Sequence, residues 1–457
     1  MTNFTFINHA SYLIETENSL LIVDPWVEGG AFDNGWALLD KSITNSKLVE
    51  HLNGFQKKIF IWISHEHSDH FSVAFLKMLK KKNVTVKFIF QKTLDGRVSK
   101  FITKLGFQII ESNDTLEIID TELSIITFPY AGGDSYSLTI LKDFSILNIN
   151  DCDVSDRKGA NSVIFNLKKY TNKVDLLLTQ FGYANWVGNV NDKYLREEFA
   201  QKKLSTISLQ VKNFSPTAVI PFASFIYFSH NENFHTNDSQ NTPRDVQRLF
   251  KKDKVLDKLI VLKPWDKLDL NQNLVQDQTV RTSNIKYWDN LFKKIKPNDL
   301  FESQFSIDEI EKEYKAFRKK IFKSFLFAPS LLEIMGFISP IKFYLKDQNL
   351  NLDLSYCSKI RIQKGNKSVC DMSLSSATLN FILQNEYGAN TTHVNGKFER
   401  VSKHGVQIFL RFFSPQEYMK MGYGLNHPFT TISIVIGKLF HKMKSKNWDI
   451  NPSNELK

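Results

Sequence analysis

The first 150 residues alternate short apolar runs with turns, a pattern typical of β-strands. Apolar runs of strand length occur at residues 12–15, 20–23, 59–63, 84–90 and 145–149. Between them, two segments repeat apolar side chains at helical intervals and carry lysines on the other side, which predicts helices that cover a sheet, at residues 73–82 and 93–105. The alternation of strands and helices favours layers of α-helices and β-sheets.

This pattern continues to about residue 265 and then changes. Residues 174–178 and 218–223 predict buried strands, with a helical pattern over residues 192–213 between them. A polar segment rich in Asn, Gln and Asp at residues 270–283 predicts a domain boundary. We therefore expect three parts: a first domain, a linker with a helix, and a smaller C-terminal α+β domain of unknown role, at residues 1–268, 269–328 and 329–457.

The C-terminal half contains signals for one helix start and for two strands. Ser306 is followed three residues later by Glu309, the spacing of a capping box, which predicts the start of a helix that links the first domain to the C-terminal domain. Beyond it, residues 352–356 and 407–412 alternate in a way that predicts strands.

Composition narrows the class of protein. With 457 residues, 42% hydrophobic and 13% aromatic, the chain is long and apolar enough to fold into two or three domains. Its three cysteines do not form a disulfide pattern. No N-terminal leader and no run of about 18 apolar residues is visible, so we expect a cytoplasmic protein without a transmembrane segment.

The formal charge of +11 favours an anionic partner. Much of this charge lies in lysine-rich stretches that are also typical of solvated helix faces. None of the usual nucleic-acid recognition motifs accompanies the charge, so we expect an anionic small molecule and not a nucleic acid.

The candidate chemistry lies at the end of the apolar run at residues 59–63. His65, His67, Asp69 and His70 follow this run within six residues. Side chains alternate along a strand end, so His65 and His67 face one side, and the next turn can bring Asp69 and His70 towards the same point. Imidazole and carboxylate groups suit zinc, iron or manganese. The segment therefore predicts a metal site.

This HxHxDH segment resembles the metallo-β-lactamase superfamily, and the resemblance covers about residues 1–265. It implies an α+β fold, the αββα sandwich of two β-sheets flanked by helices, with a dinuclear metal site at the sheet edge. In that superfamily the ligands of the motif are divided between two metals, and further ligands come from later strand ends.

The later ligands are sought by their order in the chain. No histidine occurs between His70 and His230, so the third histidine that usually completes the first metal site is missing. Asp134 lies in the expected window, although an aspartate beside glycines is also a common turn former. The run at residues 145–149 leads to Asp151, which matches the superfamily's bridging aspartate, with Asp153 in reserve. His230 follows an apolar strand and is the last candidate ligand.

A closer resemblance appears when several segments are considered together. The chain is similar to the metallo-β-lactamase-like domain of the CMP-N-acetylneuraminate hydroxylases in five segments: Asp24-Pro-Trp26-Val-Glu-Gly29, Asn34-Gly-Trp36, the HxHxDH motif with Ile63-Ser before it, Ile146-Leu-Asn-Ile-Asn-Asp151-Cys152, and Pro221-Phe-Ala223. That family also has an aspartate at the place of Asp134. No Cys-x-His with a later Cys-x-x-His is present here, so we do not expect a Rieske cluster in this sequence.

The resemblance implies a division of ligands. His65, His67 and Asp134 would hold one metal, and Asp69, His70 and His230 the other, with Asp151 shared. Other positions have weaker support. His9 could face the site as a catalytic group, as a group that supports a ligand or as a substrate contact, or it could be a core histidine, and Asp24 could orient a ligand histidine or cap a loop. Three loop residues could line a substrate pocket or simply pack: Tyr183, Asn185 and Trp186.

The sequence leaves two functions open. A two-histidine, one-carboxylate set is associated with non-haem iron, which favours an oxygenase or hydroxylase of an anionic substrate, a nucleotide sugar among them, that receives electrons from a separate protein. The alternative is a zinc or manganese hydrolase of an ester, lactone or phosphodiester, in which the metal makes a water acidic and Asp69 orients it.

Overall fold

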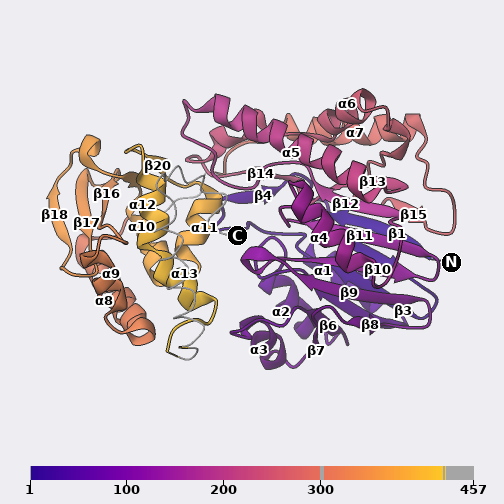
Figure 1. Ribbon diagram of the computed structural model, residues 1–457, viewed down its shortest axis with the longest axis horizontal. Helices are drawn as coiled ribbons and strands as arrows, with labels where there is room; N and C mark the ends of the chain where they lie inside the picture. The colour runs from indigo at the N-terminus through magenta and orange to yellow at the C-terminus, as the bar shows by residue number, and fades with distance from the viewer. Residues whose placement is uncertain (1, 299–302, 426–427, 429–457) are drawn as a thin grey trace. The chain divides into compact units, whose positions relative to one another are not determined.

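The computed structural model of this chain describes residues 2–298, 303–425 and 428 (Figure 1). These residues form two compact units. The first is built from residues 2–184, 193–229 and 234–297, and the second contains Asn185–Asp192, His230–Asn233 and the described residues from Asn298 onwards.

The first unit contains two large β-sheets. The seven-stranded sheet has the order β15-β1-β2-β3-β5-β6-β7, with β1 Asn3–Asn8, β2 Ser11–Glu15, β3 Ser19–Val23, β5 Lys58–Ile63, β6 Lys87–Phe90, β7 Gln108–Glu111 and β15 Lys267–Asp269. The six-stranded sheet has the order β13-β12-β11-β10-β9-β8, with β8 Leu116–Ile118, β9 Leu123–Pro129, β10 Ser135–Leu141, β11 Phe144–Asn150, β12 Leu176–Gln180 and β13 Ala218–Phe222. Strands β4 Trp36–Leu38 and β14 Ile226–Phe228 pair separately.

Strand β5 shows how the layers arise from the sequence. Its side chains alternate between two faces, so Ile61 and its neighbours two residues away pack against helices, whereas Phe60 and Trp62 face the core shared with the other sheet. The Trp62 indole N–H crosses to β9 and donates to the Thr127 hydroxyl at 2.9 Å. Helices cover both outer faces (Figure 1): α1 Asn45–Asn53, α2 Val73–Lys81, α3 Arg97–Lys104, α4 Arg157–Leu167, α5 Lys193–Phe214, α6 Pro243–Lys252 and α7 Gln278–Phe292. This is the α+β sandwich that the sequence predicted.

Parallel strands in the two sheets bring their carboxyl ends to one place. Strands β3, β5 and β6 are parallel in one sheet, and β11, β12 and β13 are parallel in the other. Hydrogen bonds join the two sheets at these ends: the Asn150 amide at the end of β11 donates to Asp24 Oδ2 at 3.0 Å, and the Ser135 hydroxyl at the start of β10 donates to the Ser64 carbonyl at 2.5 Å. The polar residues after these strands therefore meet at a shared edge.

The second unit has a five-stranded sheet in the order β18-β17-β16-β19-β20, with β16 Ile341–Leu345, β17 Leu350–Leu354, β18 Arg361–Lys364, β19 Met372–Leu374 and β20 Glu399–Arg400. Its helices are α8 Ile307–Phe325, α9 Ala328–Ile334, α10 Ser376–Gln384, α11 Gly388–Asn395, α12 Gly405–Phe412 and α13 Ser414–Lys420. A separate apolar core joins this sheet to α8, α10 and α12. Among the described helices, none is long and apolar enough to cross a membrane.

Three expectations about the C-terminal half can be compared with the structure. The capping box at Ser306 is confirmed, since its hydroxyl accepts from the Glu309 backbone N–H. The boundary lies later than expected, because α7 packs Trp288 into the core of the first unit, while α8 contributes to the core of the second. The predicted strand at residues 407–412 is wrong: these residues belong to α12, because a short apolar run fits a buried helix as well as a strand.

Partial burial of His393 in α11 predicts that the protein is less stable in acid. Burial lowers the pKa of His393 from 6.5 to about 4, so the folded protein takes up the proton less readily than the unfolded chain. The contribution of this side chain to stability is therefore complete above pH 6.5 and is lost as the pH falls towards 4. Between about pH 7.5 and 4.5, we expect the unfolding free energy of the wild type to fall by about 2 kcal/mol more than that of His393→Gln. Denaturant unfolding tests this, with the exposed His404→Gln as control, and equal losses in wild type and His393→Gln would contradict it.

Candidate metal centre

The HxHxDH motif lies where β5 ends at the shared strand edge. After Ser64 the chain turns back on itself, and the backbone N–H groups of His70 and Phe71 donate to the His67 carbonyl at 3.0 and 2.7 Å. The Ser72 hydroxyl then caps α2. This tight turn keeps the four candidate ligands together, and three of them are fully buried: His65, Asp69 and His70.

The first triad consists of His65, His67 and Asp134, whose potential ligand atoms lie within 4.8 Å of one another. His65 Nε2 lies 2.9 Å from His67 Nδ1 and 3.9 Å from Asp134 Oδ1. Asp134 follows Gly132 and Gly133, which both have positive φ, 80° and 94°. Glycine adopts this conformation without strain, so these two residues let the chain turn and present the carboxylate.

Two further triads share residues with the first. The second triad consists of His65, His70 and Asp151, with His70 Nε2 3.3 Å and His65 Nε2 3.9 Å from Asp151 Oδ2. The third triad consists of His9, Asp69 and His70. In it, Asp69 Oδ2 lies 3.3 Å from His9 Nε2 and 3.2 Å from His70 Nε2. The structure therefore brings His9 beside the motif, which the sequence left open.

Asp24 fixes the orientation of His70. Its Oδ2 atom lies 2.9 Å from His70 Nδ1 and accepts from the Ser64 hydroxyl at 2.6 Å and the Asn150 amide at 3.0 Å, while its Oδ1 accepts from the Ser64 backbone N–H at 2.8 Å. With its only hydroxyl proton donated to Asp24, Ser64 Oγ must accept from His65 Nδ1, which lies 2.9 Å away. Both imidazoles thus carry their proton on Nδ1 and present Nε2 to the centre.

Backbone strain marks the same edge. His9, Asp24 and Asn150 all have positive φ, between 37° and 52°, and each lies at the end of a strand. Residues other than glycine rarely adopt this conformation, and it costs about 1–3 kcal/mol where the surrounding structure enforces it. Such strain at three contributors to one cluster is typical of a functional site.

The electrostatics of the triads fit a bound cation. Burial alone would lower the pKa of His70, but the charges of Asp69, Asp151 and Asp24 outweigh it and raise that pKa well above 6.5. Burial would raise the pKa of Asp69, but His70 and His9 lower it well below its usual value. The buried carboxylates around His70 therefore favour a positive charge at this point, which a metal ion would supply.

Buried atoms without a hydrogen-bond partner test whether the triads suit a metal ion. His70 Nε2 lies close to two carboxylate oxygens yet forms no hydrogen bond, and Asp69 Oδ1 and His9 Nδ1 are also buried without a hydrogen-bond partner. Ligand atoms held at about 2.1 Å from one cation lie roughly 3 to 3.5 Å apart. The 3.2 and 3.3 Å separations around His70 Nε2 fall in this range. The donor set and its spacing therefore suit a metal ion.

The remaining predicted residues lie elsewhere or have other contacts. His230 follows β14, lies among the residues of the second unit, and is in none of the three triads, so its role as a ligand stays a prediction. The Tyr183 hydroxyl donates to the Thr236 carbonyl at 2.5 Å, and burial raises its pKa. Trp186 packs against Phe398. Asp153 is in none of the three triads, and the substrate pocket, to which Asn185 was assigned, stays a prediction.

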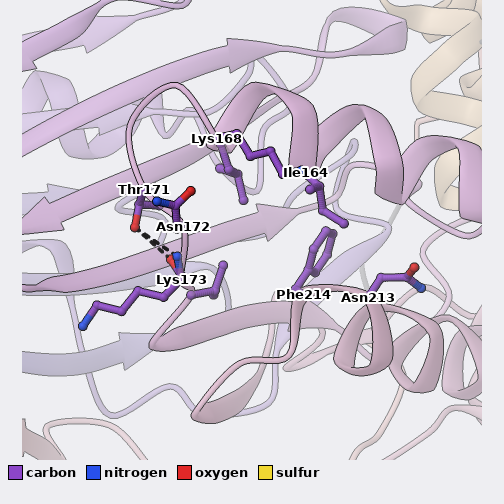
Figure 2. Close-up of a pocket in the computed structure, with 9 residues that line it drawn as sticks. Ile164, Lys168, Thr171, Asn172, Lys173, Asn213 and Phe214 are labelled. Carbon is purple, nitrogen blue, oxygen red and sulfur yellow. Dashed lines mark hydrogen bonds between the residues drawn. The ribbon is translucent and has the colours of Figure 1, made fainter.

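Sequence reasoning missed Ser64, Asn150 and Gln180, which form hydrogen bonds with the candidate ligands or with Asp24. Their signal was weak, because each is a common polar residue, although all three lie at strand ends. A cleft of about 110 Å³ lies apart from the triads, between the end of α4 and the end of α5 (Figure 2). Its lining includes Lys168, Lys173 and Phe214 but none of the candidate ligands.

Comparison with known proteins finds relatives of this chain at low sequence identity. No family model matches the chain. Over 235 residues it is 25% identical to cytidine monophosphate-N-acetylneuraminic acid hydroxylase of Xenopus laevis, which covers 50% of this chain and 38% of the relative. The chain thus spans half or less of the length of the curated relatives it matches first.

Two solved structures are similar at lower identity. The diiron β-hydroxylase CmlA of Streptomyces venezuelae is 13% identical, with a TM-score of 0.42 over 59% of this chain and 54% of that one. The metallo hydrolase Igni18 of Ignicoccus hospitalis is 14% identical, with a TM-score of 0.38 over 58% and 97%. The first unit has two sheets between helices and the HxHxDH motif at the strand ends, which agrees with the αββα sandwich that the metallo-β-lactamase resemblance implied. The proteins it resembles carry the names of metal-dependent enzymes, hydroxylases and hydrolases.

Proposed function

We propose that the first unit is a metal-dependent oxygenase or hydroxylase with a dinuclear centre. The first triad would hold one cation. Asp69 and His70 would hold the second, with Asp151 shared between them and His230 as a further ligand. The observation that carries the proposal is the first triad itself, because two imidazoles and one carboxylate are the ligand set of non-haem iron that reacts with oxygen.

The bound metal decides between two kinds of chemistry. When bound, iron would supply the electrons that activate oxygen, whereas zinc or manganese would make a water acidic enough to attack an ester, lactone or phosphodiester. The hydrolase is the second candidate function, and one observation favours it. Asp69 Oδ1 is buried and has no hydrogen-bond partner, so it can accept a hydrogen bond from a water and orient it.

Asp69 and His9 have roles in both candidate functions. Asp69 uses Oδ2 towards His9 and His70, which leaves Oδ1 to accept a hydrogen bond from a water or from a substrate hydroxyl. His9 Nε2 holds the carboxylate in place from the turn between β1 and β2. We therefore assign the orientation of the reacting water or hydroxyl to Asp69 and the positioning of its carboxylate to His9.

For the substrate we propose an anionic small molecule. The formal charge of +11 would draw an anion towards the protein. The name of the Xenopus laevis relative makes a cytidine nucleotide sugar the first substrate to assay. As an oxygenase, the enzyme would receive electrons from a separate electron-transfer protein, and Tyr183, Asn185 and Trp186 remain the proposed pocket residues.

Metal analysis of the full chain, purified without added metal and without oxygen, tests this function. We expect about two iron ions per chain, and oxygen uptake when a chemical reductant and an anionic nucleotide sugar are added. Two zinc ions with no oxygen uptake, but with cleavage of an ester or phosphodiester, would replace the oxygenase by the hydrolase. Protein that retains no transition metal would contradict both functions.

A further inference from the structure

Lys203 is linked to the metal centre through one intervening side chain. It lies on α5, and its ammonium group donates to Gln180 Oε1 at 2.5 Å. Gln180 ends β12, and its amide nitrogen donates to Asp151 Oδ1 at 3.2 Å. The same nitrogen lies 3.5 Å from the Ala223 carbonyl oxygen. A continuous chain of hydrogen bonds therefore runs from the helix to a residue of the second triad.

The chemistry of these groups permits only one direction for the chain. An ammonium group can only donate hydrogen bonds, and an ionised carboxylate can only accept them, whereas an amide does both at different atoms. The carbonyl oxygen of Gln180 must therefore face Lys203, and its NH₂ group must face Asp151. A flipped amide would place its oxygen against a carboxylate and its NH₂ group against an ammonium ion.

This direction assigns different tasks to the two oxygens of Asp151. Oδ1 is occupied by the Gln180 amide, whereas Oδ2 faces His70 Nε2 at 3.3 Å and His65 Nε2 at 3.9 Å. We infer that Lys203 is a positioning residue: by fixing the Gln180 amide, it holds Asp151 so that Oδ2 points towards the metal. This inference rests on the proposed function, since it concerns the same centre.

The surroundings of Lys203 agree with this role. Burial lowers the pKa of Lys203, and the charges of Asp153, Asp151 and Asp134 oppose that effect by favouring the ammonium form. The ammonium group is thus held near several carboxylates while it donates its hydrogen bond to Gln180. Partners of this kind behind a metal ligand typically change metal affinity by about 10- to 100-fold.

Removal of Lys203 changes two things at once, so a single variant is not decisive. Loss of the hydrogen-bonded chain should weaken cation binding, whereas loss of a positive charge should strengthen it. A double-mutant cycle with Lys203→Met and Gln180→Met separates the two effects. The charge effect is present with and without Gln180 and cancels, so the coupling reports the chain alone.

The experiment measures zinc affinity of the metal-stripped full chain by competition with a chromophoric chelator. We expect Gln180→Met to weaken binding about tenfold, and a coupling of about tenfold between the two substitutions. Lys203→Arg should retain most of the affinity, since it keeps a cationic donor. The matched control Lys202→Met removes an exposed charge from the same helix and should show no coupling to Gln180→Met.

The outcomes are distinguishable. Equal melting temperatures of the metal-free variants, together with the coupling, support positioning of Asp151. Unchanged affinity in Gln180→Met, or a coupling within twofold of none, would overturn the role of Lys203 while leaving the proposed function in place. Wild-type protein that binds no zinc would instead contradict the metal centre itself.

Discussion

His65→Ala is expected to remove the metal of the first triad, to weaken binding of the second metal through Asp151, and to reduce activity by more than about 100-fold. His65 belongs to the first and the second triad, and its Nε2 lies within 4 Å of Asp134, Asp151 and the His67 ring. Loss of an outer partner of a metal ligand already costs about 10- to 100-fold, so loss of the ligand itself should cost more. Metal content per chain and the rate of substrate turnover measure the effect.

His67→Ala is the informative comparison for this result. His67 belongs only to the first triad, so its loss should remove one metal and leave the other bound. His404→Ala, at an exposed position of the second unit, is the control and should behave as wild type. If His65→Ala retained two metals or full turnover, the three triads would not be the catalytic centre.

The fold of the first unit was predictable because its signals are local. Alternation in β5 and helical spacing in α2 each place apolar side chains on defined faces, and the structure has both elements at nearly the expected bounds. Residues 407–412 show the limit of this reasoning, since a run of six apolar and polar residues does not reveal whether it will pack as a helix or a strand. The boundary between the two units was expected too early for a similar reason, because only packing shows that Trp288 belongs to the core of the first unit.

The candidate centre was predictable to the extent that its residues end strands. His65, His67, Asp134 and Asp151 follow strands that end at one edge, and the structure groups them. His9 was ambiguous in sequence, because only the fold of β1 and β2 brings its imidazole to Asp69. Lys203 gave no signal at all, since a lysine on a helix is usually solvated, and its link to Asp151 depends on the side chain of Gln180.

Asp24 combines stability and metal binding in one carboxylate. It is fully buried and accepts hydrogen bonds from the Ser64 N–H and hydroxyl groups and from Asn150, besides holding His70 Nδ1. Each buried donor left without an acceptor costs about 1–3 kcal/mol. In Asp24→Asn, an NH₂ group would replace one carboxylate oxygen and face donors, so at least one of them would lose its partner.

We therefore expect Asp24→Asn to lower the unfolding free energy of the metal-free protein by about 3 kcal/mol and to weaken zinc binding at least about tenfold. Backbone strain does not explain such a loss, because asparagine tolerates the positive φ of 39° at this position as well as aspartate does. Denaturant unfolding and chelator competition measure the two effects, with the exposed Asp143→Asn as control. Reduced stability with unchanged zinc affinity would mean that Asp24 supports only the fold, and that His70 keeps its orientation without it.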